Sequence, residues 1–322
     1  MSVERIIEIA SDNRHLAAFR GFMTVSERGE ELGRIPLDSI SAVIANAHGL
    51  TYSNNLLTAL AERGTPLVIC GSNHAPAAFL WAVDGHHTQS ARIDSQIKST
   101  QPMAKQLWKQ IVYAKIKGQA NVLEALGKTK APVEFLASKV KSGDPENIEA
   151  QAARRYWGLL FGTEFRRDRQ QEGKNSLLNY GYTIVRSSVA RALLASGLHP
   201  GIGIHHRNIY NHMRLVDDVM EPYRPYVDFV VWHLGQEGCK EVSPDAKRLL
   251  ASMAEMAIPM KDGIYPMRRA IQKTSISLAK IYENGKAVKL DLPEYKLPLW
   301  QAQEDGYGTF ERAQADVDDG YV

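Results

Sequence analysis

Asp217, Asp218 and Glu221 place three carboxylates in one short segment of the chain. On a helix, Glu221 lies three residues from Asp218 and four from Asp217, so two or three carboxylates can share one face. Like charges this close are unfavourable unless a positive charge lies between them, and carboxylate oxygens suit a hard divalent cation such as Mg²⁺ or Mn²⁺. The alternative is that Asp217 and Asp218 are solvated or paired with Arg214 and Arg224.

Two neighbouring histidines, His205 and His206, precede the acids. Adjacent side chains point in different directions on most backbones, so we expect at most one histidine to face the carboxylates. A third candidate is Glu149, and the small side chains of Ala152 and Ala153 would let its helix face pack closely against another helix. Taken singly, a histidine is more often structural than a ligand, and Glu149 would be an ordinary surface residue.

The sequence contains none of the motifs expected for several other enzyme classes. There is no phosphate-binding Gly-x-x-x-x-Gly-Lys-Ser/Thr loop, no Gly-x-Ser-x-Gly nucleophile and no Gly-x-Gly-x-x-Gly after a strand. The absence of a His-Asp doublet argues against that class of metal phosphohydrolase. The only cysteines, Cys70 and Cys239, exclude a disulfide-stapled scaffold and a four-cysteine zinc site, and they fit a reducing cytosol.

The composition is that of a globular protein. The 322 residues are 44% hydrophobic and 23% charged, which suggests one large or two ordinary domains. No stretch approaches the roughly 18 apolar residues of a membrane helix, and the N-terminus has no signal-peptide core, so we expect a cytoplasmic protein without a membrane segment. Residues 98–174 carry 15 Lys/Arg against 8 Asp/Glu, which makes them a candidate surface for a polyanion.

The character of the chain changes near residues 84–90. Before this point, short apolar segments predict strands at residues 5–9, 16–25, 39–45, 67–70 and 77–83, with one helix at 54–62. After it, helical periodicity predicts helices that include residues 104–111, 175–196, 243–257 and 267–282. The sequence therefore predicts an α+β protein with a small β-rich N-terminal domain (1–88), a larger all-α domain (89–290) and an acidic tail (291–322) that is disordered or binds a partner.

Four segments, in this order, resemble a known family. They are EAQAARRYW at 149–157, LNYGY at 178–182, GIHHRN at 203–208 and DDVMEPYRPYVD at 217–228. In these segments, and in domain order up to about residue 285, the chain is similar to the CRISPR-associated spacer-acquisition integrase. That family is the metal-dependent endonuclease and strand-transfer subunit of CRISPR adaptation. The run Met-Glu-Pro-Tyr-Arg-Pro is most similar to the subfamily of systems with a single large effector nuclease, type II.

The resemblance implies a Mg²⁺ or Mn²⁺ ion held by Glu149, His206 and Glu221, which would be the catalytic residues. His206 is favoured over His205 because the family's ligand stands three residues after the glycine matched by Gly203. The histidine doublet keeps His205 as an alternative.

Asp218 matches a second acidic position near the metal in some members of the family. Two positions depart from the family's pattern: Trp157 stands where Phe is common, and Ala150 stands where Gly is common. Neither is in the ligand set.

The implied reaction is attack by the 3′-hydroxyl of a captured DNA fragment on a phosphodiester at the repeat edge of a CRISPR array. A bound metal would lower the pKa of that hydroxyl and neutralise the phosphate.

The resemblance also implies partners. They are double-stranded DNA, a second copy of the chain joined through the β-rich domain, and a small CRISPR-associated adaptation protein that completes a heterohexamer. Candidate phosphate contacts are Lys105, Lys109, Arg154, Arg155, Arg166, Arg167 and Arg169. Tyr180 and Tyr182 fit core packing as well as DNA stacking. The competing hypothesis is a DNA-binding scaffold with a degenerate or structural metal site.

Overall fold

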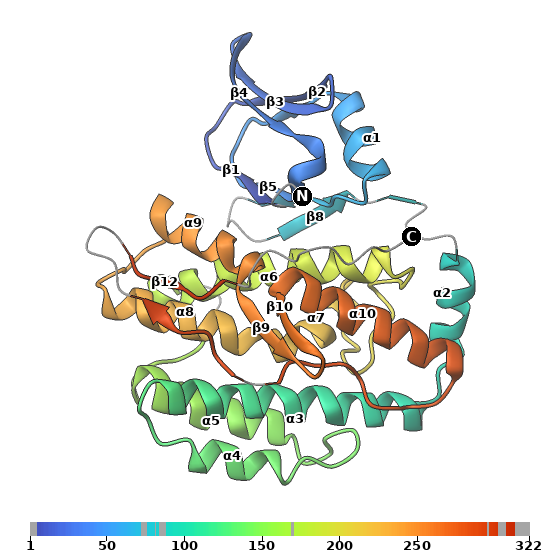
Figure 1. The fold of residues 1–322 in the computed structure, drawn as a ribbon, viewed down its shortest axis with the longest axis vertical. Coiled ribbons are helices and arrows are strands. Elements are labelled where there is room, and N and C mark those ends of the chain that lie inside the picture. The colour runs from blue at the N-terminus through green and yellow to red at the C-terminus, as the bar shows by residue number, and fades with distance from the viewer. Residues whose placement is uncertain are drawn as a thin grey trace.

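The computed structural model describes residues 5–71, 76–80, 82–83, 88–168, 171–294, 296–301 and 307–312. A strand-rich N-terminal part lies at one end of the molecule, and a larger helical part forms the rest (Figure 1). This arrangement confirms the predicted α+β fold class. Within the described residues, no helix has the length and apolarity needed to cross a membrane.

The N-terminal part holds two four-stranded sheets. One has the order β1-β5-β7-β8, with parallel pairs except for β7–β8, and the other has the order β4-β3-β2-β6. The elements are β1 (Arg5–Ile9), β2 (His15–Phe19), β3 (Phe22–Glu27), β4 (Glu30–Pro36), β5 (Ile40–Ala45), β6 (Thr51–Tyr52), α1 (Asn54–Glu62), β7 (Leu67–Cys70) and β8 (Pro76–Leu80). Leu56 and Leu60 of α1 are fully buried in the same apolar cluster as Leu16 and Met23.

The single strand predicted at residues 16–25 is wrong. The chain turns back at Arg20 and Gly21, whose φ angles are +47° and +82°, so β2 and β3 form an antiparallel hairpin. Two residues with positive φ are typical of a tight hairpin turn, but Arg-Gly lacks the usual Asn or Asp signal. The strands β4 and β6 were also not predicted.

The helical part is built around α3. Its helices are α2 (Gln89–Ile97), α3 (Gln101–Ala125), α4 (Ala131–Ala137), α5 (Ile148–Phe161), α6 (Lys174–Ala195), α7 (Arg214–Met220), α8 (Arg224–Gln236), α9 (Pro244–Ala251) and α10 (Met267–Asn284). Thr100 caps α3 by accepting the N–H of Met103 at 3.4 Å, and Pro102 occupies its first turn. The α3 helix packs against α4, α5 and α8, so most of its length is buried.

The predicted helix at 243–257 ends early. After α9 the chain makes a 3₁₀ turn (Ser252–Glu255) and an antiparallel hairpin of β9 (Ala257–Met260) and β10 (Gly263–Pro266). The larger domain is therefore largely helical rather than all-α. The predicted domain boundaries near residues 88 and 290 stay predictions.

Part of the predicted acidic tail is ordered. Strands β11 (Trp300–Gln301) and β12 (Thr309–Phe310) pair, and the Trp300 ring stacks on His233 with 4.3 Å between ring centroids. Trp300 Nε1 donates to Glu237 Oε1 at 3.0 Å, and Phe310 is buried. The prediction of disorder is wrong for these segments, because their aromatic side chains supply the apolar contact that the acidic composition obscured. Residues 302–306 and 313–322 of the predicted tail lie outside the described residues.

The two tyrosines of the LNYGY segment both act structurally. Tyr180 OH donates to Glu8 Oε2 at 2.6 Å, and Lys247 Nζ lies 2.9 Å from the other oxygen of Glu8, so these contacts join β1 to α6 and α9. Tyr182 OH donates to Asp228 Oδ1 at 2.5 Å, and Tyr156 OH donates to Asp228 Oδ2 at 3.1 Å. Burial raises the pKa of Asp228 to about 6, although the two tyrosine hydroxyls and Arg224 oppose the shift.

We expect the variant Asp228→Asn to lose part of the pH dependence of stability. Between the unfolded pKa of about 4 and the folded pKa of about 6, the native state binds more protons than the unfolded state, so the free energy of unfolding falls as pH rises. Urea unfolding at pH 4.5 and pH 7 should show wild type losing roughly 2 kcal/mol more than the variant. Equal losses in the two proteins would contradict this account of Asp228.

Candidate functional site

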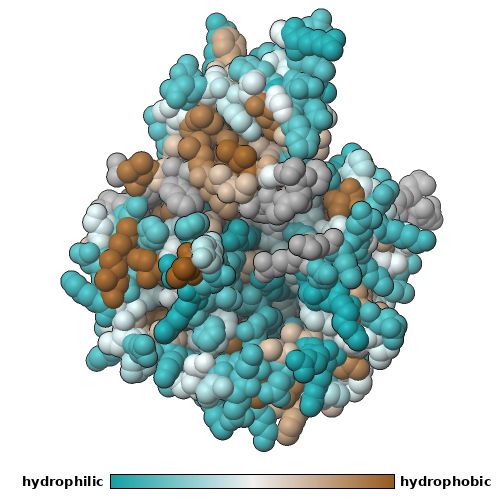
Figure 2. Space-filling view, turned by 180° about the vertical axis from the view of Figure 1, so that it is seen from behind, coloured by the Kyte–Doolittle hydropathy of each residue, from teal (hydrophilic) through white to brown (hydrophobic). Residues whose placement is uncertain are grey.

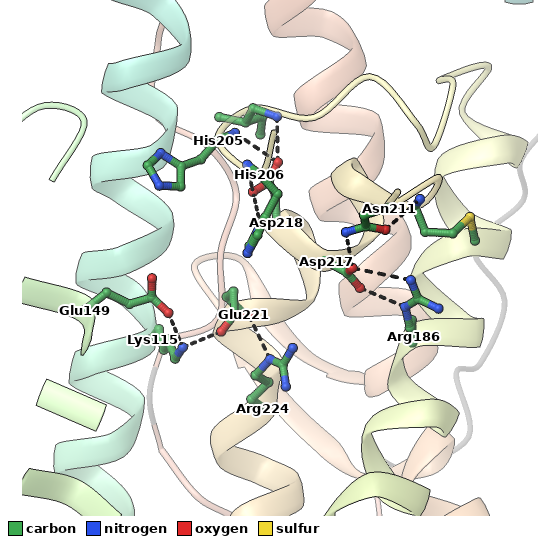
Figure 3. A network of polar contacts seen from close by, with 12 residues as sticks. Lys115, Glu149, Arg186, His205, His206, Asn211, Asp217, Asp218, Glu221 and Arg224 are labelled. Atoms are coloured by element: carbon green, nitrogen blue, oxygen red, sulfur yellow. Dashed lines mark hydrogen bonds and ion pairs between the residues drawn. The ribbon is translucent and has the colours of Figure 1, made fainter. Parts of the chain in front are cut away.

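The three clustered carboxylates each bind different partners. Asp217, on α7, pairs with Arg186 of α6, with 2.7 Å from Nε to Oδ1. Asp217 Oδ2 also accepts from Asn211 Nδ2 at 2.8 Å (Figure 3). Pairing with an arginine was one of the two alternatives for Asp217, but the arginine is Arg186 rather than Arg214. Asp217 therefore anchors the segment and has no oxygen directed at a shared metal position.

Asp218 holds the histidine loop in place. Its carboxylate is fully buried and accepts the backbone N–H groups of Ile204, His205 and His206 at 2.6, 3.1 and 3.2 Å. Asp218 Oδ1 also lies 2.7 Å from His206 Nδ1. A side chain at Gly203 would collide with the His206 carbonyl at 2.8 Å and meet Asp218 Oδ2 at 3.1 Å, so only glycine fits this turn. With both oxygens engaged, Asp218 positions the loop.

The two histidines face different surroundings. The His205 ring stacks on Trp108 of α3, with ring centroids 4.2 Å apart and planes 1° apart. His206 turns to Asp218, and this hydrogen bond is the main cause that raises the pKa of His206. The Glu221 charge also raises that pKa, so the ring lies within the field of Glu221. Because Nδ1 is bound to Asp218, Nε2 is the ring nitrogen left for a ligand.

Glu149 lies in the first turn of α5, where the backbone is firmly held. Asn147 caps the helix with φ +50° and accepts the N–H of Ala150. The buried carboxylate of Asp144 accepts the N–H groups of Ile148 at 2.9 Å and of Glu149 at 3.0 Å. Asp144 and Asn147 thus fix the point from which the Glu149 side chain projects. Ala152 is fully buried and α5 packs on α3, as the small side chain predicted.

Lys115 of α3 lies between Glu149 and Glu221. Its Nζ is 2.5 Å from Glu149 Oε1 and 2.5 Å from Glu221 Oε2 (Figure 3). Burial alone would lower the pKa of Lys115, but Glu221 and Glu149 outweigh it, so the pKa is raised. Burial opposes ionisation of Glu221 as well, yet Arg224 and Lys115 hold the pKa of Glu221 at about 2. The site therefore contains two carboxylates around one ammonium.

The arrangement fits a cation. Two carboxylate oxygens from different helical segments converge on a single positive atom, and Figure 3 shows His206 in the same region. Two carboxylates and an imidazole form a donor set suited to Mg²⁺ or Mn²⁺. In the part of the chain that the structure describes, no three His, Cys, Asp or Glu side chains are grouped closely enough to hold a metal. The Lys115 ammonium lies between Glu149 and Glu221.

The candidate phosphate contacts divide into exposed and internal residues. Lys105, Lys109, Arg154, Arg155 and Arg166 are exposed. The Arg167 guanidinium instead turns inward, with 2.9 Å to Asn175 Oδ1 and 2.6 Å to Asn179 Oδ1, and it ties the loop after α5 to α6. Arg169 lies outside the described residues.

Comparisons with known proteins show the family and agree with the fold. Residues 7–241 match the family described as CRISPR associated protein Cas1. The chain belongs to the Cas1 family. The CRISPR-associated endonuclease Cas1 of Neisseria meningitidis serogroup C (strain 8013) is 34% identical over 292 residues, which cover 89% of this chain and 95% of that protein. The predicted enzyme class, a CRISPR-associated endonuclease of adaptation, is thereby confirmed.

Solved structures share the Cas1 fold at low sequence identity. A casposase bound to an integration product has a TM-score of 0.75 and 16% identity, and the match covers 89% of this chain and 92% of that one. A chain of a Cas6-RT-Cas1–Cas2 complex has a TM-score of 0.71 and 18% identity, covering 91% of this chain and 36% of that one.

Sequence reasoning missed Lys115 and Asp144 as parts of this candidate site, and it named Arg224 only as a possible partner of Asp217 and Asp218, not of Glu221. Lys115 carried a signal, because it continues the apolar stripe of α3 that runs through Leu107, Trp108 and Ile111. A charged residue at a core position needs a partner. The partners, Glu149 and Glu221, come from distant segments that only the fold brings together.

Proposed function

We propose that this Cas1 protein is a metal-dependent DNA endonuclease and integrase of CRISPR adaptation. It joins the 3′-hydroxyl ends of captured DNA to the repeat of the array by transesterification, in the cytoplasm. The observation that carries the proposal is the convergence of Glu149 and Glu221 on one cation position, with His206 held nearby by Asp218. The type II subfamily is part of the proposal, supported by the MEPYRP run and the Neisseria relative.

In this proposal, Glu149, Glu221 and His206 Nε2 hold Mg²⁺ or Mn²⁺. When bound, the ion supplies charge to neutralise the reacting phosphate and to lower the pKa of the attacking hydroxyl. Asp218 keeps the proton of His206 on Nδ1, which leaves Nε2 as the ligand atom. Arg224 Nε lies 2.8 Å from Glu221 Oε1 and fixes the orientation of that carboxylate.

The proposed partners are double-stranded DNA, a second copy of this chain and a small adaptation protein. Figure 2 shows hydrophobic side chains gathered on the β-rich end of the molecule, which supports pairing of two copies there. A Cas1–Cas2 assembly appears among the structural relatives, which supports a small partner that completes a heterohexamer. Exposed basic residues on α3 and α5 are candidates for DNA phosphates. They are Lys105, Lys109, Arg154 and Arg155, with Arg166 just after α5.

One observation favours the alternative of a DNA-binding scaffold with a degenerate metal site. Lys115 pairs with both carboxylates and Arg224 pairs with Glu221, so two positive charges already balance the two acids, and structural ion pairs need no metal. Under this alternative, the protein binds DNA but transfers no strand.

Strand transfer in vitro distinguishes the two functions. Labelled duplex DNA with free 3′-hydroxyls is mixed with a supercoiled plasmid bearing the repeat, the small partner and Mn²⁺. We expect wild type to move label into the plasmid and His206→Ala to lose at least about 100-fold of this activity, because a ligand and its charge balance are lost.

The matched control is His205→Ala, which removes only the ring stacked on Trp108. We expect it to retain transfer. Loss with His205→Ala and retention with His206→Ala would reverse the ligand assignment, and absence of transfer by wild type with DNA binding intact would favour the scaffold.

A further inference from the structure

Lys115 occupies the position that the proposed function assigns to the metal. Its Nζ lies 2.5 Å from an oxygen of Glu149 and 2.5 Å from an oxygen of Glu221, and its side chain is only 10% exposed. We infer that Lys115 is a built-in cation that fills the metal position in the metal-free protein and must be displaced before an ion can enter. This inference rests on the proposed metal-dependent function.

A positive charge is needed at this point even without a metal. Glu149 and Glu221 project toward each other from α5 and from the 3₁₀ turn Glu221–Tyr223, and Glu221 is almost fully buried. Two carboxylates brought this close in a buried place repel each other and lose hydration. Arg224 contacts Glu221, whereas Lys115 contacts both acids. Lys115 is thus the counter-charge that the two carboxylates share.

The ammonium and a divalent ion cannot occupy this gap together. An ion bound to both carboxylates would have oxygens at about 2.1 Å, so it would lie in the space that Nζ now fills. A positive charge a few ångströms from the ion would also repel it by Coulomb's law. The Lys115 side chain reaches the gap from α3 on a flexible four-carbon stem, which can swing away while its backbone stays in the helix (Figure 3).

This arrangement has two opposite effects on the site. Lys115 keeps the carboxylates ionised and close together before the metal arrives, so the site is formed in advance. It also competes with the ion, so it weakens metal binding. Removing the Lys115 charge should therefore destabilise the metal-free protein and strengthen the binding of metal.

The test is a calorimetric Mn²⁺ titration of the full chain, together with thermal unfolding in EDTA and in Mn²⁺. We expect Lys115→Met to bind Mn²⁺ at least about 10-fold more tightly than wild type. Its melting temperature should fall in EDTA and rise more on Mn²⁺ addition than that of wild type. If the methionine variant folds poorly in EDTA, Lys115→Gln replaces it in the test, because glutamine keeps hydrogen-bond donors for the two acids. The Mn²⁺ affinity of Lys115→Gln should also exceed that of wild type.

The matched control is Lys117→Met, because Lys117 lies on the same helix and pairs with Glu134 of α4 away from the site. Its Mn²⁺ affinity should equal that of wild type. Binding by wild type with no gain in either Lys115 variant would overturn the inference and leave the proposed function standing. No Mn²⁺ binding by wild type or by any Lys115 variant would overturn the metal site itself. Binding by the Lys115 variants alone would support the inference and favour the scaffold function.

Discussion

Glu221→Gln is expected to abolish metal-dependent strand transfer, with a loss of at least about 1,000-fold, while DNA binding persists. Lys115 and Arg224 hold the pKa of Glu221 at about 2, so this side chain is a carboxylate at every working pH. Glutamine has nearly the same shape, and its amide oxygen can still accept from Arg224. It lacks the negative charge that a divalent ion requires. The loss should therefore appear in the chemical step. The free energy of unfolding should fall as well, because the buried Lys115 and Arg224 lose a paired charge.

The measurement is label transfer into the plasmid beside a gel-shift assay with the same duplex. Glu255→Gln is the matched control, because Glu255 also pairs with an arginine, Arg268, at 2.9 Å, but contributes nothing to the proposed site. It should retain wild-type transfer. A Glu221→Gln protein that keeps more than about a tenth of wild-type transfer would exclude Glu221 as an essential ligand.

Asp218→Ala is expected to produce the largest loss of stability, because three backbone donors and the His206 ring all depend on this buried carboxylate. Hydrogen bonds to a charged group contribute about 1.5–3 kcal/mol each, and donors left without a partner add a further cost. Some of the backbone N–H groups that lose Asp218 can hydrogen-bond to water instead, so the cost is smaller than the sum of the lost bonds. We expect the free energy of unfolding to fall by about 3–5 kcal/mol. Strand transfer should fall with it, since His206 loses its orientation.

Asp218→Asn separates a positioning role from direct metal binding. If Asp218 only positions the loop, the asparagine variant should lose stability and Mn²⁺ affinity together. Unchanged urea unfolding with lost Mn²⁺ affinity would make Asp218 a ligand and contradict the assignment. Asp217→Asn, which weakens the contacts of the neighbouring residue with Arg186 and Asn211, should cost less than Asp218→Ala.

The strongest periodic elements could be predicted from the sequence. The helix predicted at 54–62 matches α1, and those predicted at 175–196 and 267–282 match α6 and α10 within two residues. Apolar residues at helical spacing and terminal glycines are local signals, so these elements need no knowledge of distant contacts. The β2–β3 hairpin was missed because Arg20 adopts positive φ in a turn without the usual residues.

The site could be predicted only in part. Motif order pointed to Glu149, His206 and Glu221, and these residues lie in one region of the structure (Figure 3). The partners of the acids could not be predicted, because Lys115 is 34 residues from Glu149 and Arg186 is 31 residues from Asp217. Helical spacing suggested a shared carboxylate face, whereas tertiary contacts gave each acid its own partner.

The most direct test of the central claim is a crystal structure of the protein with Mn²⁺, with the ion located by anomalous scattering. We predict one ion about 2.1–2.2 Å from carboxylate oxygens of Glu149 and Glu221 and from His206 Nε2, with the Lys115 side chain turned out of the gap. A peak bound elsewhere, or no peak at saturating Mn²⁺ with Lys115 still between the two carboxylates, would contradict it.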